Sequence, residues 1–395
     1  MPHAQAAPDL PSVMASLGVS PPASVVTESS GDSIPPVKVC AITSWFPSAV
    51  HPGAGSFVAQ DISALSRDHD VHFIHLVDPH LNDGVRFLIQ GNAHGIRLPF
   101  DPRRPQTIAH ALEAMIPFLQ HADVVHTMAF SSLLKLALSD VPVPIVHTEH
   151  WSEIMRIDAG KASWAKRAAC RTVFRRPHAL VGVSTYLANQ LEDISGRETL
   201  VVPNIVSAPA LMAPFTLHDA VRLLAVGHLT AVKDPLLAID TLAELTKRGV
   251  DVRLTWAGTG PMEAQVRAYS VELGVAERVH LCGHVDRSRL TELLKQCHVV
   301  LHTSREETFS LVAAEALAAG RPLVIQDRGG HRDFTREPYA TFVHERTAQN
   351  FADAVENAIN AGQTLDFTPI STMIHDSYSE GAFRARWNRI YEGVQ

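Results

Sequence analysis

This chain of 395 residues lacks an apolar run of about 20 residues, the length that a membrane-spanning helix needs. It also lacks an excess of positive charge: 34 Lys and Arg against 41 Asp and Glu give a formal net charge of −7, which argues against nucleic acid as a partner. Its four cysteines have no metal-ligand spacing, which favours a reducing compartment. Residues 1–35 contain no Lys or Arg and no apolar centre, so they lack the marks of a secretory signal. We therefore expect a disordered leader on a cytoplasmic protein.

What the chain does have, from Val37 onward, is an alternation of short β-rich runs with amphipathic helical runs. Nearly continuous apolar strands between amphipathic helices predict parallel sheets covered on both faces. The alternation is interrupted at Ser207–Thr216, which has two prolines and no charge. We predict an α/β fold of two doubly wound, Rossmann-like domains facing a cleft. The predicted strands are Val37–Phe46, Asp70–Val77, Ile96–Phe100, Ala122–Met128, Pro144–His150, Ala179–Ser184 and Thr199–Pro203, then Val221–Gly227, Val252–Ala257, Arg278–Gly283, His298–Ser304 and Pro322–Gln326.

The most informative segment is Ser304–Val324, which places Glu307 and Glu315 eight positions apart. Glu307 follows a predicted buried strand, at the carboxyl end where open α/β sheets bind ligands. Glu315 lies on the next helix, roughly 7 Å further along the axis at about 1.5 Å per residue. Two acids so placed can hold two parts of one extended polar ligand. A helix N-terminal acid together with a solvent-facing glutamate explains the same pattern equally well.

A glycine-bearing loop, Pro47–Phe57, follows the first predicted strand. Gly53 and Gly55 permit a close backbone approach, and the helix that starts near Ser56 offers unpaired N–H groups to an anion. The loop is not G-x-G-x-x-G and is too long for a dinucleotide turn. We therefore do not predict a dinucleotide cofactor.

Two further glycine-bearing loops lie at strand ends of the second half. In Gly227–Pro235, Lys233 is either a point charge for a phosphate or a solvated lysine ahead of a helix. In Gln326–Asp333, Gly329 and Gly330 can present backbone N–H groups to a diphosphate. Cation, amide donors and carboxylates around one cleft suit a sugar nucleotide.

These segments closely resemble the retaining glycosyltransferases of family 4, which have the GT-B fold. In the C-terminal half the resemblance covers roughly residues 221–335 through V-G-H-L-T-A-V-K-D, A-G-T-G-P-M, V-H-L-C-G-H-V, the E-x7-E element of Glu307 and Glu315, and G-G-H-R-D. The N-terminal half is similar through S-W-F-P…G-A-G-S-F-V, D-V-V-H, V-H-T-E-H, V-G-V-S and V-V-P-N. The segment Y-S-E…W-N-R-I-Y-E resembles the family's last helix, which crosses back onto the first domain. The expected parts are an acceptor-side domain (36–206), a linker (207–220), a nucleotide-sugar domain (221–375) and a crossing helix (376–395).

The resemblance implies roles for individual residues. Glu307 would contact the donor sugar, Glu315 the ribose and Lys233 the diphosphate, while His150 would face the transferred sugar. The remaining donor-site residues that it implies are Gly227, His228, Gly283, Val285, Phe309, Ser310, Gly329 and Gly330, and its acceptor-side first loop contains Gly53, Gly55 and Ser56. It further implies retaining transfer of a hexose from a nucleotide diphosphate sugar to a glycan, glycolipid or small-molecule acceptor, in cell-surface polysaccharide or glycolipid synthesis, without a cofactor or metal.

Two departures from the family pattern bear on these roles. The family usually has arginine where this chain has His228, and a histidine makes no bidentate phosphate contact. Asn204–Ile205 replaces the usual Asn-Gly, which predicts a different turn between the domains. Two alternatives stay open: a nucleotide-sugar epimerase on the same fold, and a non-catalytic nucleotide-sugar-binding protein.

Two patterns that resemble metal sites are not expected to bind a metal. Asp68 and Asp70 form a D-x-D pattern, but it precedes a strand, whereas a chelating pair should follow one and point into the cleft. His147 and His150, even with Glu149, lack further ligands at familiar spacing.

A basic segment, Arg156–Arg176, carries seven basic residues against one acid and includes Trp164. It is typical of a helix that docks on anionic lipid, in which case a lipid-linked acceptor follows. A solvated face beside the acceptor site explains the segment equally well.

Overall fold

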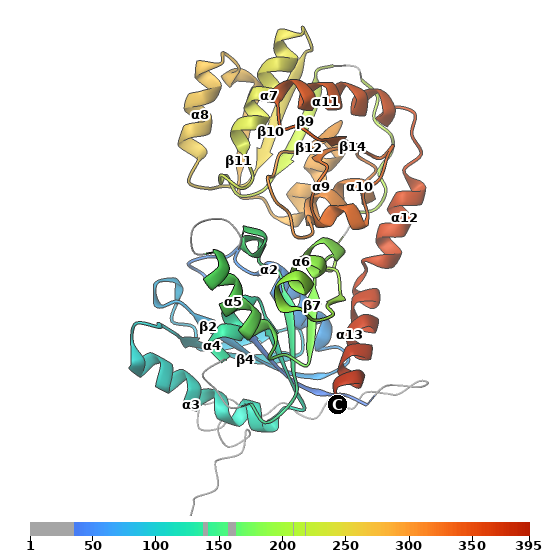
Figure 1. Cartoon of the computed structure of the whole chain (residues 1–395). Coiled ribbons are helices and arrows are strands. Elements are labelled where there is room, and N and C mark those ends of the chain that lie inside the picture. The colour runs from blue at the N-terminus through green and yellow to red at the C-terminus, as the bar shows by residue number, and fades with distance from the viewer. Residues whose placement is uncertain (1–34, 137–140, 157–162, 208, 218) are drawn as a thin grey trace, which may run out of the picture. The chain divides into compact units, whose positions relative to one another are not determined.

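The computed structural model describes residues 35–136, 141–156, 163–207, 209–217 and 219–395, and it divides the chain into two compact units (Figure 1). The first unit comprises the chain up to Val183 together with Ala188–Ile205 and Phe383–Gln395. The second comprises Ser184–Leu187 and Val206–Ala382. The predicted leader, residues 1–35, lies outside the described residues except for its last position.

The first unit is built on an eight-stranded sheet in the order β3-β4-β2-β1-β5-β6-β7-β8. Every neighbouring pair is parallel except β3 with β4, and later strands lie on both sides of β1, as in a doubly wound fold. Its strands are β1 (Lys38–Thr43), β2 (Asp70–Val77), β3 (Phe87–Gln90), β4 (Ala93–Pro99), β5 (Val124–Met128), β6 (Ile145–Glu149), β7 (Ala179–Gly182) and β8 (Leu200–Val201). Its helical elements are α2 (Ser56–Leu65), η1 (Pro79–Leu81), α3 (Pro105–His121), α4 (Phe130–Leu136), η2 (Ser152–Arg156), α5 (Ser163–Phe174), most of α6 (Thr185–Ser195) and α13 (Glu380–Val394).

The last helix belongs to the first unit, as the predicted crossing helix requires. Phe383, Trp387 and Tyr391 recur every four residues on α13 and are buried in that unit's core, with the Tyr391 hydroxyl 2.8 Å from Nδ1 of His126. The predicted start at residue 376 is wrong, because α12 (Thr368–Ser377) still belongs to the second unit and the chain leaves helical geometry at Tyr378.

The second unit contains a six-stranded, all-parallel sheet in the order β11-β10-β9-β12-β13-β14. Together the two sheets confirm the predicted fold class. The strands are β9 (Val221–Val226), β10 (Val252–Ala257), β11 (Val279–Gly283), β12 (Val299–His302), β13 (Leu323–Gln326) and β14 (Ala340–Val343). The helical elements are α7 (Pro235–Lys247), α8 (Glu263–Glu272), η3 (Ala276–Arg278), α9 (Arg287–Gln296), α10 (Leu311–Ala318), η4 (Gly330–Asp333), α11 (Ala348–Gly362) and α12.

The predicted linker, residues 207–220, is not a free connection where the structure describes it. The backbone N–H of Met212 donates to the Ala319 carbonyl, and the Arg321 guanidinium donates to the Ala213 carbonyl. The Phe215 side chain is buried against the His298 ring, with 4.9 Å between ring centroids. The segment is thus an extended strap packed on the second unit, and its apolar residues fit that role better than a solvated linker.

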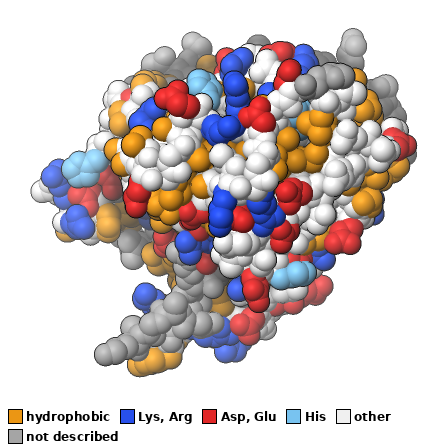
Figure 2. All heavy atoms as spheres, turned by 90° about the horizontal axis from the view of Figure 1, so that it is seen from above, with side chains coloured by type: hydrophobic (Ala, Val, Ile, Leu, Met, Phe, Trp, Pro, Cys, Tyr) orange, Lys and Arg blue, Asp and Glu red, His pale blue; other side chains and the backbone are white. Residues whose placement is uncertain are grey.

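The face seen from above carries Lys and Arg interspersed with Asp and Glu, as an ordinary solvated surface does (Figure 2). At the end of α7, for example, Arg248 forms ion pairs with Glu244, Asp353 and Glu356. Within the described ranges, every helix is too short or too polar to cross a membrane.

Candidate functional site

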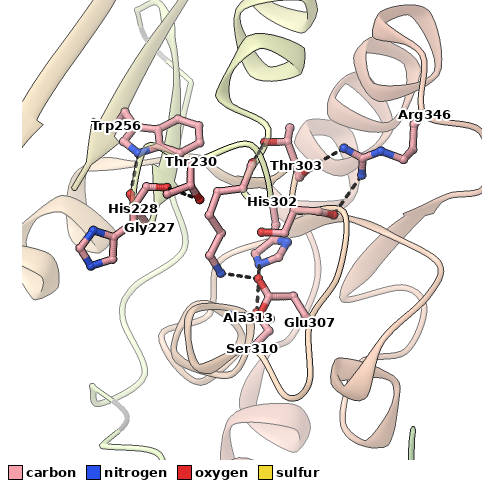
Figure 3. Close-up of polar contacts among 12 residues, drawn as sticks. Gly227, His228, Thr230, Trp256, His302, Thr303, Glu307, Ser310, Ala313 and Arg346 are labelled. Atoms are coloured by element: carbon pink, nitrogen blue, oxygen red, sulfur yellow. Dashed lines mark hydrogen bonds and ion pairs between the residues drawn. The ribbon is translucent and has the colours of Figure 1, made fainter. Parts of the chain in front are cut away.

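The site in the second unit begins where the glycine loops after β9, β10 and β11 touch. Carboxyl ends of parallel strands meet at one edge of a sheet. A Cβ on Gly258 would lie 2.0 Å from the Gly227 carbonyl oxygen, and the Gly258 N–H donates to the Gly283 carbonyl at 2.8 Å. The Trp256 indole donates to the same Gly227 oxygen at 2.9 Å (Figure 3). Glycine is therefore required at position 258 for these loops to approach, and the predicted Gly227 and Gly283 lie together.

Glu307 lies at the centre of a polar cluster on the loop after β12 (Figure 3). Its Oε1 atom is 2.5 Å from Nζ of Lys233 and 3.1 Å from Nε2 of His302. The structure thus brings together Glu307 and Lys233, which the sequence singled out, and adds His302, which it did not.

The protonation of Glu307 is set by these neighbours. Burial opposes its ionisation, but the charge of Lys233, followed by the contact from His302, outweighs that effect and holds the pKa of Glu307 well below its usual range. Glu307 is therefore an ionised hydrogen-bond acceptor at neutral pH.

The backbone around Glu307 is fixed by the two glycines after β13. The Gly330 N–H donates to the Glu307 carbonyl at 2.9 Å, and a Cβ on Gly330 would lie 1.9 Å from the Thr308 oxygen. Gly329 has a φ of 139°, and a Cβ there would come within 3.0 Å of the Glu307 oxygen. The prediction that Gly330 presents its N–H to a diphosphate is thus wrong for this structure, because that N–H already positions Glu307.

Ser310 connects this loop to the helix behind it. It adopts a φ of 76°, which non-glycine residues rarely do, and its hydroxyl caps α10 by accepting from the Ala313 N–H. The same hydroxyl lies 3.0 Å from Nε2 of His302. Ser310 therefore acts on the site through His302 and the start of α10.

Arg346 and Asp234 form a brace that the sequence analysis missed. The Arg346 guanidinium donates to the Asp234 carboxylate, to the Thr303 carbonyl and to the Ser304 carbonyl, at 2.7, 2.7 and 2.9 Å. Asp234 immediately follows Lys233, and Thr303 and Ser304 lead to Glu307, so the brace joins the two loops. A contact between residues 112 positions apart leaves no periodic signal in the sequence.

Glu315 lies half-buried on α10. Within the described ranges, no hydrogen bond or ion pair is recorded for its carboxyl group. Burial raises the pKa of Glu315 to about 7, and the charge of Arg287 offsets only part of this. A half-buried acid without a partner is more typical of a ligand site than of a core.

Other predicted donor residues are placed differently. The Phe309 side chain is buried among Phe334 and Tyr378, with ring centroids 5.2 and 5.7 Å away, so its predicted donor contact is wrong and its role is packing. The His228 ring points away from Glu307 in Figure 3, and its Nδ1 atom lies 3.1 Å from the Thr259 carbonyl oxygen. Val285 follows Gly283 in the half-buried turn before α9.

In the first unit, His150 directly follows β6 and packs on Phe57 of α2, with 4.6 Å between ring centroids. Burial, with a further contribution from His147, lowers the pKa of His150 to about 3, so the ring is neutral at physiological pH. Its own backbone N–H and that of Trp151 both donate to the Glu149 carboxylate at 2.8 Å. This carboxylate is thus used to shape the chain at His150.

The first loop of the same unit turns at Gly55, which has a φ of 63° and precedes α2. A Cβ there would lie 2.3 Å from the Trp45 carbonyl oxygen, so only glycine fits. Gly53 and Ser56 are exposed on either side of it. The loop follows the carboxyl end of β1, as predicted.

Comparison with known proteins agrees with this arrangement. The profile "Glycosyl transferases group 1" matches residues 214–366, and the profile "Glycosyltransferase Family 4" matches residues 53–208. Together they span most of the chain. The chain belongs to this family of GT-B glycosyltransferases.

The fold of the family is seen in similar solved structures. Sucrose-phosphate synthase from Thermosynechococcus elongatus aligns with a TM-score of 0.75 and 18% identity, over 90% of this chain and 99% of that chain. Anabaena HepE in complex with UDP and glucose aligns with a TM-score of 0.71 and 16% identity, over 91% of this chain and 100% of that chain.

A relative with a named activity is one of the subunits of the human phosphatidylinositol N-acetylglucosaminyltransferase, which is 25% identical over 64% of this chain and 58% of its own length. Such matches span 25% to 61% of the length of the curated relatives that this member of the family resembles.

Proposed function

We propose that this protein is a retaining glycosyltransferase that moves a hexose from a nucleotide diphosphate sugar to an acceptor. The observation that carries the proposal is the Lys233–Glu307 pair at the carboxyl edge of the second sheet, with Glu315 on the helix that follows. Cation and ionised acid fit a diphosphate and a sugar hydroxyl, and Glu315 fits a ribose hydroxyl. The HepE complexes, which contain UDP, UDP-glucose, or UDP and glucose, make UDP-glucose the first donor to try.

The proposed reaction needs stabilised departure of the diphosphate while the acceptor attacks the same face of the sugar. Lys233 supplies a positive charge where negative charge develops on the leaving diphosphate. Glu307 accepts a hydrogen bond from the donor sugar and fixes its orientation. His150, neutral because of its burial, contacts the transferred sugar without placing a charge beside the reacting carbon. No step in this scheme uses a cofactor or metal.

The test is transfer from UDP-, GDP- and ADP-sugars, with the anomeric configuration of the product determined by NMR. Glu307→Gln removes the charge of the proposed sugar contact and is expected to abolish transfer. Glu306→Gln is the matched control, because it makes the same change one position earlier and is expected to keep transfer. Wild-type turnover by Glu307→Gln refutes the proposal.

Two other outcomes decide for the alternatives. An altered sugar nucleotide formed without any added acceptor identifies an epimerase. Donor binding in a thermal-shift assay, with neither transfer nor hydrolysis, identifies a non-catalytic binding protein.

We further propose that α5 brings the protein to anionic membranes, where it glycosylates a lipid-linked acceptor. Trp164 is 76% exposed and Lys166 and Arg171 are exposed on the same helix, while Cys170 and Phe174 are buried. An exposed aromatic ring beside basic side chains suits a lipid headgroup region. Residues 157–162 of the predicted segment lie outside the described ranges. The human relative named for phosphatidylinositol supports a lipid acceptor.

Liposome co-sedimentation tests the membrane proposal. Binding should require anionic lipid, fall at high salt, and weaken in Trp164→Ser. Binding that is indifferent to both lipid charge and salt rules out the proposed contact.

A further inference from the structure

The two acids of the D-x-D pattern serve different purposes in the first unit. Asp68 forms an ion pair with Arg384 of α13 and accepts a hydrogen bond from the side-chain amide of Asn388. Asp70, the first residue of β2, instead faces two histidines. Its Oδ1 atom lies 3.5 Å from Nδ1 of His72, and its Oδ2 atom lies 3.7 Å from Nε2 of His121.

Both separations are too long for hydrogen bonds, which extend from about 2.7 to 3.2 Å for nitrogen and oxygen. They are close to the distance between two ligands of a tetrahedral metal, which is roughly 3.4 Å when each metal bond is about 2.1 Å. The three ligand atoms lie within 4.8 Å of one another. In the part of the chain that the structure describes, this is the single group of three or more His, Cys, Asp or Glu residues that meets that condition.

The two rings are held in place by packing. Phe118 and His121 are three positions apart on α3, so they lie on the same helix face. The His72 ring packs edge-on against both, with centroid distances of 6.1 Å to Phe118 and 5.8 Å to His121. The side chains of Asp70, His121 and His72 are 49%, 33% and 12% exposed, so an ion from solvent can reach them.

We propose that Asp70, His72 and His121 bind a zinc ion that ties β2 to the end of α3. Two imidazoles and a carboxylate form a donor set that zinc accepts, and water completes the fourth position. Asp70 lies at the amino end of β2, whereas the first loop with Gly55 follows the carboxyl end of the neighbouring β1. The ion therefore lies at the opposite edge of the sheet from that loop and stabilises the fold without taking part in transfer.

The test is metal binding by the full chain after treatment with a chelator. Calorimetric titration with Zn²⁺ should give one tight equivalent in the wild type that is lost in His121→Ala and in Asp70→Asn. His110→Ala is the matched control, because His110 is exposed on the same helix and lies outside the cluster. Co²⁺ should give the strong visible absorption of a four-coordinate site in the wild type and in His110→Ala only.

Zinc should also raise the thermal transition of the wild type and leave that of His121→Ala unchanged, since an ion bound only to the folded state stabilises it. Circular dichroism at low temperature establishes that each variant is folded. Equal zinc stoichiometry and affinity in the wild type and His121→Ala overturns the proposal, as does a wild type that binds no zinc. Neither readout involves a sugar nucleotide, so its failure is independent of the proposed function.

Discussion

Replacing Lys233 by methionine tests how far its ion pair with Glu307 maintains the site. The two side chains are 28% and 13% exposed, and their charged atoms are 2.5 Å apart. Methionine keeps much of the apolar stem but leaves a mostly buried carboxylate with His302 as its remaining recorded side-chain partner. Breaking a fully buried pair costs about 3–5 kcal/mol, and the partial exposure of the lysine reduces the expected loss to about 2 kcal/mol.

Scanning calorimetry measures this loss as a shift of the second unit's transition. About 2 kcal/mol corresponds to a fall in Tm of roughly 4–8 °C for a domain of about 150–250 residues. Adding Glu307→Gln to Lys233→Met should restore about half of the loss or more, because the double variant no longer buries an unpaired charge. Lys247→Met is the control: its pair with Glu244 is exposed on the lysine side and 3.9 Å long, so it should change stability by less than about 0.5 kcal/mol.

The pH dependence has a defined sign. In the wild type the pKa of Glu307 is lowered on folding, so the pair's stabilisation is present above the unfolded pKa of 4.5 and is lost as pH falls through the folded value. In Lys233→Met, burial dominates and raises the pKa of Glu307, so its penalty is full at neutral pH and fades as pH falls toward 4.5. The Tm difference should narrow from about pH 8 to about pH 5. A constant difference, or a double variant no more stable than Lys233→Met, refutes the reasoning.

Two further substitutions test other parts of the site. Gly330→Ala places a methyl group 1.9 Å from the Thr308 oxygen and should lower both Tm and transfer, whereas Gly393→Ala, which meets nothing within 4 Å, should change neither; an unperturbed Gly330→Ala contradicts the close approach. Glu315→Gln should abolish the pH dependence of nucleotide affinity near pH 7, because burial raises the pKa of Glu315 to about 7 and only the ionised form is a full acceptor. Isothermal titration from about pH 6 to about pH 8 checks this, and wild-type affinity that does not rise with pH argues against a ribose contact.

The sequence predicted best the strands that are buried on both faces. The predicted Asp70–Val77 coincides with β2, because a strand covered by helices on both faces is a continuous apolar run. β3 was missed for the opposite reason: it is a four-residue antiparallel edge whose Phe87 and Ile89 are exposed. β14 was missed because four residues, two of them half-buried, give too short a signal.

The same distinction separates the site residues that were predicted from those that were not. Glu307 was found because an acid directly after a buried strand stands out against its surroundings. His302, at the end of that strand, and Arg346, before α11, act through contacts with distant residues, which a linear pattern does not contain. Phe309 misled because an aromatic residue two positions from the proposed sugar contact resembles a ligand contact, whereas its burial depends on Phe334 and Tyr378.

The contacts of Glu307 also indicate how the proposed donor would change the site. Its side chain is held by Lys233 from the loop after β9 and by His302 from β12, and its backbone by Gly330 after β13. On the proposed function, the diphosphate takes over Lys233, so the Oε1 atom of Glu307 loses a partner when the sugar hydroxyl arrives. The two exchanges compensate one another, because neither the ionised acid nor the lysine is left buried without a partner. His302 and Gly330 keep Glu307 in place during that exchange.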